Sequence, residues 1–214
     1  MSAKKTASAK AAPRRPVQAR GIQTREKILQ AGEALLLRHG FHNILADDIA
    51  RAAGVSVGSF YAYFEDKRAL FLAVLQRAST AMVAGSAEQL AGWLTQSDIE
   101  AESLLRKTIR LLIEGHRIYL PLYQEAREMA AHDADIRRYL GESDRSTREI
   151  FEQMIRRFNP RLKPDRLHSV TYVVYSAVEG IVHSLVDDQL SEIDQEAAVQ
   201  EASRLLGQYF RALG

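Results

Sequence analysis

At 214 residues, of which 46% are apolar, the chain is long enough for one or two domains with packed cores. It contains no cysteine, which excludes disulfides and thiolate metal sites. The net charge of +2 divides unevenly, because residues 1–70 carry twelve Lys and Arg against six Asp and Glu, whereas residues 71–214 carry seventeen against twenty-one. Only the N-terminal part is therefore suited to binding a polyanion.

The sequence predicts neither export nor membrane insertion. The N-terminus lacks the apolar stretch of a secretory signal. The longest apolar run, residues 170–186, contains Glu179 and His183 and is too short and too polar to favour a membrane span. We therefore expect a soluble, cytoplasmic protein with no membrane partner.

Residues 1–22 are predicted to form a disordered basic arm, since they are rich in Ala, Pro and basic residues and contain no acid. The basic residues are Lys4, Lys5, Lys10, Arg14, Arg15 and Arg20. Such an arm either keeps the protein soluble or adds contacts to phosphates or to a minor groove, and the sequence leaves both uses open.

Residues 23–68 are predicted to form a small helical domain that ends in a helix-turn-helix. Ile49 and Ala52 give a first short helix its apolar side, and Gly54 follows where a helix end favours a positive φ. Ser56 then stands where the next helix needs an N-cap acceptor. In a helix-turn-helix, the second helix lies in the major groove of DNA.

Between Thr24 and Leu75 the chain resembles the TetR family of transcriptional regulators. The match covers about fifty residues without a gap. The matching positions are Ile28-Leu29, Leu35-Leu36, Gly40-Phe41, Asp48-Ile49-Ala50, Ala53-Gly54-Val55-Ser56, Gly58, Tyr61, Tyr63-Phe64 and Lys67. The resemblance implies a three-helix DNA-binding domain followed by a larger helical domain that binds a small molecule and forms a homodimer.

The expected recognition helix runs from Val57 to Tyr63 and carries few candidates for contacts with DNA. Gly58 allows close approach to the backbone, Ser59 can bond a base edge, and Val57 can touch a thymine methyl group. Tyr61 and Tyr63 have hydroxyls that reach phosphates, although they could instead be core aromatics as we expect for Phe60 and Phe64.

Two further positions complete the predicted DNA-binding set of Asn43, Ser56, Val57, Gly58, Ser59, Tyr61, Tyr63 and Lys67. Lys67 opens the following helix, where free backbone N–H groups also favour phosphate. The family usually has hydroxyl residues before its second helix, whereas this chain has Ile44 and Leu45. We expect Asn43 to take over that capping and phosphate-binding role.

Residues 69–214 are predicted to be helical throughout, so the fold class is all-α with about nine helices. Apolar stripes run through residues 105–123, 136–158, 170–186 and 198–210. Gly85 and Gly92 weaken the preceding pattern and suggest a junction there, and Pro121 should break or kink its helix. A strand pattern and an internal repeat are both absent from the sequence.

Polar residues on apolar helical faces are the candidates for binding a ligand. The predicted set is Leu112, His116, Tyr119, Tyr123, Met154, Tyr175 and Glu179. Such groups would orient a mostly apolar molecule in a pocket between helices. Alternatively, Glu179 pairs with an arginine and His183 lies at an interface. Glu179 and His183 alone do not make a metal site, so we expect no metal and no cofactor.

The last two long helices are predicted to form the dimer interface, because both have wide apolar faces. The interface residues expected are Val178, Ile181, Val182, Leu185, Leu205, Leu206 and Tyr209. The sequence shows no nucleophile with its base, no phosphate loop and no metal cluster, so we do not expect an enzyme.

The resemblance thus implies a homodimeric, ligand-responsive repressor that binds palindromic operator DNA and responds to a small-molecule effector. The alternatives are a DNA-binding activator or architectural protein without an inducer, or a helical carrier or enzyme.

Overall fold

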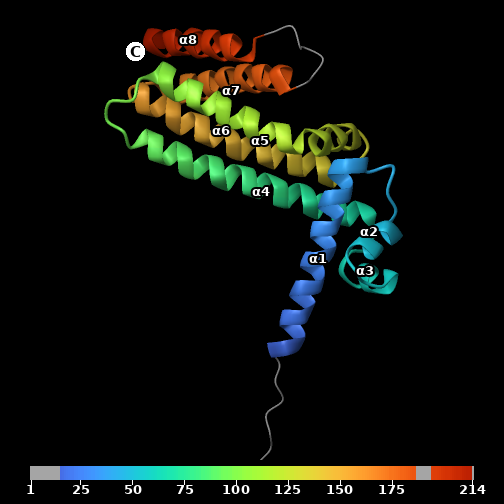
Figure 1. Cartoon of the computed structure of the whole chain (residues 1–214). Helices are drawn as coiled ribbons and strands as arrows, with labels where there is room; N and C mark the ends of the chain where they lie inside the picture. Colours follow the sequence, from blue (N-terminus) through green and yellow to red (C-terminus); the bar gives the residue numbers. More distant parts are fainter. Residues whose placement is uncertain (1–14, 187–193, 214) are drawn as a thin grey trace, which may run out of the picture. The chain divides into compact units, whose positions relative to one another are not determined.

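The computed structural model describes residues 15–186 and 194–213, and within these ranges the backbone forms eight α-helices and no strand (Figure 1). The all-α prediction is confirmed. The helices are α1 (Arg15–His39), α2 (Ala46–Ala52), α3 (Val57–Tyr63), α4 (Lys67–Leu94), α5 (Ala101–Ala130), α6 (Ala134–Phe158), α7 (Pro164–Val186) and α8 (Gln195–Leu213).

The chain divides into two compact units between Phe71 and Leu72, three residues after the predicted domain boundary. Helix α1 begins at Arg15, so the last eight residues of the predicted arm, 15–22, are helical rather than disordered. Ala, Gln and Arg are good helix formers, and a proline at Pro16 is tolerated in a first turn, where its missing N–H has no helical partner. Residues 1–14 of the arm lie outside the described residues.

The first unit is built around aromatic and aliphatic side chains of its helices. Ile28, Ile49, Phe60 and Phe71 are completely buried. Gly54 has a φ of 67°, which a glycine adopts without strain, and this confirms the predicted turn between α2 and α3. The turn brings the N-cap Ser56 to the start of α3, where its side chain accepts a hydrogen bond from the Ser59 N–H at 3.1 Å.

The second unit packs α5, α6, α7 and α8 side by side around one core (Figure 1). Helix α4 continues through Gly85 and Gly92, so the predicted junction at these glycines is wrong. A Cβ at either glycine would meet no atom within 4 Å, and isolated glycines cost a helix only about 1 kcal/mol each. Pro121 does not break α5, because the completely buried Leu122 and Ala126 hold the following turns in place.

Helix α7 has two apolar sides with different surroundings. Val174, Val178 and Val182 are completely buried within the unit, whereas Tyr172 and Val173 are 59% and 55% exposed. Within a single chain α7 is therefore not buried on most sides. By length and composition α7 is also the one helix of the described residues that could cross a membrane. Its packing against α5 and α6 accounts for the apolar character of its inner side.

Candidate functional site

Helix α3 exposes the small and hydroxyl-bearing residues that the sequence nominates for contact with DNA. Val57 and Gly58 lie at the surface, and Tyr61 is 53% exposed. Tyr63 is also exposed, and its hydroxyl lies close to Gly21 of α1. Phe60 is completely buried and fixes the helix on the core of the unit. Phe64, 4% exposed, is likewise a core residue, as expected.

The two serines at the start of α3 are joined by their side chains. The hydroxyls of Ser56 and Ser59 are 2.9 Å apart, and the Ser56 Oγ also accepts the backbone N–H of Ser59. These two bonds orient the side chain of Ser59, which is part-exposed on α3. A side chain whose orientation is already fixed loses less conformational entropy when it contacts a ligand.

Lys67 and Asn43 hold the loop between α1 and α2. The Lys67 Nζ donates to the carbonyls of Phe41 and Ile44 at 2.6 and 2.7 Å, and lies 4.2 Å from the Phe41 ring centroid. The Asn43 Nδ2 donates to the His39 carbonyl at 2.9 Å, so Asn43 caps the end of α1. The expectation that Asn43 caps α2 is wrong, because Leu45 is the N-cap of α2 and makes no side-chain cap bond.

Replacing Lys67 with Met is expected to loosen this loop. The change removes two hydrogen bonds to a charged donor, worth about 2 kcal/mol in a part-buried position. Amide hydrogen exchange at Ile49 and Ala50 of α2 should become about thirtyfold faster, because local opening costs less. The matched control is Lys27→Met at an exposed position of α1. Unchanged exchange in Lys67→Met would show that the lysine does not support the loop.

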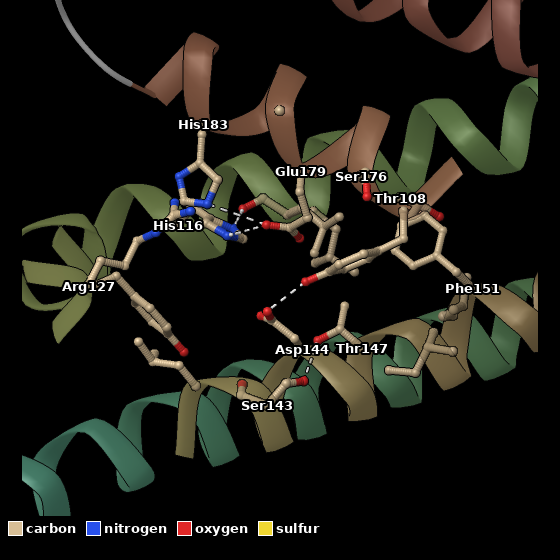
Figure 2. A pocket seen from close by; sticks show the side chains of 18 residues that line it. Thr108, His116, Arg127, Ser143, Asp144, Thr147, Phe151, Ser176, Glu179 and His183 are labelled. Atoms are coloured by element: carbon tan, nitrogen blue, oxygen red, sulfur yellow. Dashed lines mark hydrogen bonds and ion pairs between the residues drawn. The ribbon is translucent and has the colours of Figure 1, made fainter. Parts of the chain in front are cut away.

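The second unit contains a partly open cavity of about 470 Å³ among α4, α5, α6 and α7 (Figure 2). Five of the seven predicted ligand residues line it, namely Leu112, His116, Tyr123, Tyr175 and Glu179. Tyr119 and Met154 do not line it. Met154 is 1% exposed and belongs to the hydrophobic core, because the helical stripe that contains it turns toward the interior of the unit.

Glu179 lies between two histidines at one end of the cavity (Figure 2). Its Oε2 is 3.4 Å from the Nε2 of His116 and 3.4 Å from the Nε2 of His183. Burial alone would raise the pKa of the Glu179 carboxyl, but the hydrogen bonds and charges of the two histidines outweigh it and lower the pKa to about 2. Within the described residues of one chain, Glu179 is therefore paired with these two histidines, whereas an arginine across a subunit interface and an interface position for His183 stay predictions.

His116 is 6% exposed and makes one backbone contact besides its contact with Glu179. Its Nδ1 lies 2.8 Å from the Leu112 carbonyl. Burial would lower the pKa of His116, but the hydrogen bond and the charge of Glu179, aided by that carbonyl, raise it above its ordinary value. The Tyr123 ring stacks beside His116 at 6.3 Å, and the His183 ring meets it edge-on at 4.9 Å.

A second polar group stands at the α6 wall of the cavity. The Tyr175 hydroxyl donates to the Asp144 carboxylate at 3.2 Å (Figure 2), and the Arg148 guanidinium lies 5.5 Å from the Tyr175 ring centroid. Burial, together with the charges of Glu179 and Asp144, raises the pKa of the Tyr175 phenol. Polar side chains of α5, α6 and α7 therefore line the cavity, together with the apolar side chains of Leu112 and Phe151.

Two family comparisons cover most of the chain. Residues 28–74 match the family described as "Bacterial regulatory proteins, tetR family". Residues 102–209, just over half of the chain, match "Tetracyclin repressor-like, C-terminal domain". The chain belongs to the TetR family. The predicted resemblance, made from the first unit alone, is thereby confirmed and extends to the second unit.

Among curated proteins, this TetR-family chain is similar to the HTH-type transcriptional repressor NemR of Escherichia coli strain K12, with 43% identity over 54 residues. That match covers 25% of the chain and 27% of NemR, so the chain spans about a quarter of that relative's length.

Solved structures extend the likeness to the whole fold. A TetR transcription regulator from Haloarcula marismortui ATCC 43049 covers 90% of this chain and 98% of its own, with 19% identity and a TM-score of 0.67. The SmeT–triclosan complex covers 88% of this chain and 90% of its own, with 17% identity and a TM-score of 0.58. At these identities the likeness establishes a shared TetR fold.

Some residues that line the cavity of this TetR-family chain were absent from the predicted ligand set. His183 could have been included, because it lies four residues after Glu179 and so shares its helical face. Asp144 and Thr147 carry no such signal, since both lie in the polar sequence of α6 and only the packing of α6 on α7 turns them to the cavity.

Proposed function

We propose that this TetR-family chain is a cytoplasmic, homodimeric transcriptional repressor that leaves its operator when a small, mostly apolar molecule fills the cavity. The observation that carries the proposal is the exposed face of α3. Val57, Tyr61 and Tyr63 are exposed on this face, whereas the buried Phe60 on the opposite side fixes the helix on the core of the unit. A recognition helix needs this arrangement to enter a major groove.

The contacts on α3 divide into reading and positioning roles. Ser59 is the candidate for a base edge, with Val57 beside it for a thymine methyl group. The exposed hydroxyls of Tyr61 and Tyr63 suit phosphates, which fix register without reading sequence. Lys67 contributes mainly by holding the loop before α2, since its ammonium already bonds two carbonyls.

Exposed apolar residues of α7 and α8 support the proposed homodimer. Tyr172, Val173, Leu205 and Tyr209 are all more than a third exposed, and Leu205 also lines a shallow groove with Ile181. Contiguous exposed apolar surface is rare on a monomer, and two helices from each subunit would bury it in a four-helix interface. Of the interface residues predicted, Val178, Val182 and Leu206 are instead buried in their own subunit.

The cavity supports an effector that is mainly apolar and carries a polar group. A volume of about 470 Å³ suits a molecule of drug-like size. SmeT, which shares this fold, was solved with the aromatic compound triclosan, and an aromatic or lipid-like effector is proposed here on that analogy. Ligand binding that favours a state unable to hold the operator would lower DNA affinity by a coupling of about 1–3 kcal/mol.

The decisive experiment measures binding to DNA upstream of the protein's own gene against random DNA of the same length. We expect a preference for the promoter, protection of a palindrome with half-sites about one helical turn apart, and steep weakening with salt as counterions are released. Ser59→Ala should lower the ratio of promoter to random affinity by about fivefold or more, as a base contact worth about 1–3 kcal/mol requires.

Tyr61→Phe is the matched control for Ser59→Ala, because it also removes one hydroxyl from α3. It should weaken binding to promoter and random DNA by the same factor, as expected for a phosphate contact. A wild-type protein that binds both DNAs equally at moderate salt would overturn the proposed function. An unchanged ratio in Ser59→Ala would remove Ser59 from base reading.

A further inference from the structure

Three ligating side chains converge at one end of the cavity. His116 of α5, with Glu179 and His183 of α7, places ligand atoms that all lie within 4.8 Å of one another (Figure 2). The sequence offered only the pair Glu179 and His183, one helical turn apart, and two ligands do not make a metal site. Packing of α5 on α7 supplies the third.

The spacing of these atoms agrees with tetrahedral zinc. Bonds of about 2.0–2.2 Å at tetrahedral angles place neighbouring ligand atoms about 3.3–3.6 Å apart. The Glu179 Oε2 is 3.4 Å from the Nε2 of His116 and 3.4 Å from the Nε2 of His183. Two edges of the tetrahedron are therefore already formed, and the ligand atoms of the two histidines, which form the third edge, lie within 4.8 Å of each other.

The backbone contact of His116 points to the same use. Its Nδ1 lies 2.8 Å from the Leu112 carbonyl, which can only accept, so Nδ1 carries a proton and donates it. In the neutral imidazole, Nε2 then carries a lone pair, which points at the Glu179 carboxylate. Such a contact is repulsive unless a second proton or a cation stands between them. A metal-bound histidine usually donates its other N–H to a carbonyl or carboxylate in this way.

The surroundings of the cluster accept a positive ion. With neutral imidazoles, Glu179 gives the cluster one negative charge, and the other charged groups along the cavity, Asp144 and Arg127, have opposite signs. Glu179 is largely buried, so bulk solvent screens its charge only weakly. The phenol ring of Tyr123 also stacks on the imidazole of His116 and restricts the rotation of the imidazole.

We propose that His116, Glu179 and His183 bind a divalent transition metal, with Zn²⁺ as the best fit, and that its fourth coordination position opens into the cavity. Two imidazoles and one carboxylate suit Zn²⁺ or Co²⁺, whereas Mg²⁺ and Ca²⁺ prefer oxygen ligands. All three ligands belong to the second unit, so the metal site can be tested independently of the proposed DNA binding.

The test is a titration of the full-length, tag-free protein with Co²⁺ after removal of metals, followed by visible absorption. A low-coordinate Co²⁺ site gives intense visible bands, and we expect them to saturate at one Co²⁺ per subunit. Added Zn²⁺ should abolish the bands at equal concentration, whereas Mg²⁺ in large excess should leave them unchanged.

Two variants and one control locate the ion. His183→Gln and Glu179→Gln should each weaken Co²⁺ binding at least tenfold, because each removes one of three ligands. Both positions tolerate an amide of similar size, since His183 is 30% exposed and Gln matches the volume of Glu. His168→Gln changes an exposed histidine of the same helix and should bind Co²⁺ as the wild type does. Thermal midpoints establish that all variants are folded.

Two results would overturn the metal site. One is the absence of saturable Co²⁺ bands in the wild type at micromolar protein, which would leave the histidines as protonated partners of Glu179. The other is equal Co²⁺ binding by wild type, His183→Gln and Glu179→Gln, which would place the ion elsewhere. A protein that binds Co²⁺ as expected but shows no operator preference would keep the metal site and reject the proposed function.

Discussion

Replacing Leu205 with Glu is expected to yield folded monomers that no longer bind the operator. Leu205 is 66% exposed in the single chain, so the subunit loses no core packing. In a two-fold interface the new carboxylate is buried twice without a partner. A cost of about 4 kcal/mol for an unpaired buried charge corresponds to about a thousandfold weaker dimer. Sedimentation at micromolar concentration and operator binding measure the two effects.

Gln200→Glu is the control for this variant. Gln200 is exposed on the same helix, lies about 140° around its axis from Leu205 and does not line the apolar groove. The substitution Gln200→Glu introduces the same side chain as Leu205→Glu but should leave the dimer intact. Leu206 is unsuitable for this test, since it is 6% exposed and a charge there would unfold the subunit. If Leu205→Glu remains a dimer, α8 does not form the interface.

Replacing Thr147 with Trp is expected to fill the cavity and block the effector while operator binding persists. Thr147 lines the cavity from α6, and a bulky indole there occupies space that a ligand needs (Figure 2). The neutral apolar dye N-phenyl-1-naphthylamine serves as the probe. Wild-type protein should enhance its fluorescence and gain about 2.7 kcal/mol of stability at a hundredfold excess over the dissociation constant. Thr147→Trp should bind the dye at least tenfold more weakly.

Ser146→Trp provides the comparison, because Ser146 is next to Thr147 in the chain but is exposed and does not line the cavity. This variant should bind the dye like the wild type. Equal dye binding by Thr147→Trp and Ser146→Trp would place the ligand site outside the cavity. Unfolding of Thr147→Trp alone would be recognised from its thermal midpoint, and Ser176→Trp then fills the same cavity from α7.

The local features of the first unit were predictable from sequence because they depend on neighbours in the chain. Gly54 and Ser56 act within four residues of their own positions, and the structure confirms both. Lys67 and Asn43 were harder to assign. The partners of Lys67 are carbonyls 23 and 26 residues away, which no local pattern identifies.

In the second unit, periodicity identified the helices but not what each face meets. A stripe of apolar residues looks the same whether it faces the subunit's own core or a partner. The sequence therefore grouped Leu205 with Leu206, although the first is exposed and the second is buried. His116 was selected because a histidine in an apolar stripe is unusual, and the structure places it in the cavity. Its convergence with Glu179 and His183 depends on the packing of α5 and α7.

The paired hydroxyls of Ser56 and Ser59 have a consequence for the choice of base. The Ser56 oxygen already accepts the Ser59 N–H, and the 2.9 Å contact between the two hydroxyls uses one further proton. When Ser59 supplies that proton, its own oxygen can only accept. It then favours the amino groups of adenine and cytosine in the major groove over the carbonyls of guanine and thymine. For the base contact proposed for Ser59, the direction of this one hydroxyl proton would thus determine which base is preferred at that position of the operator.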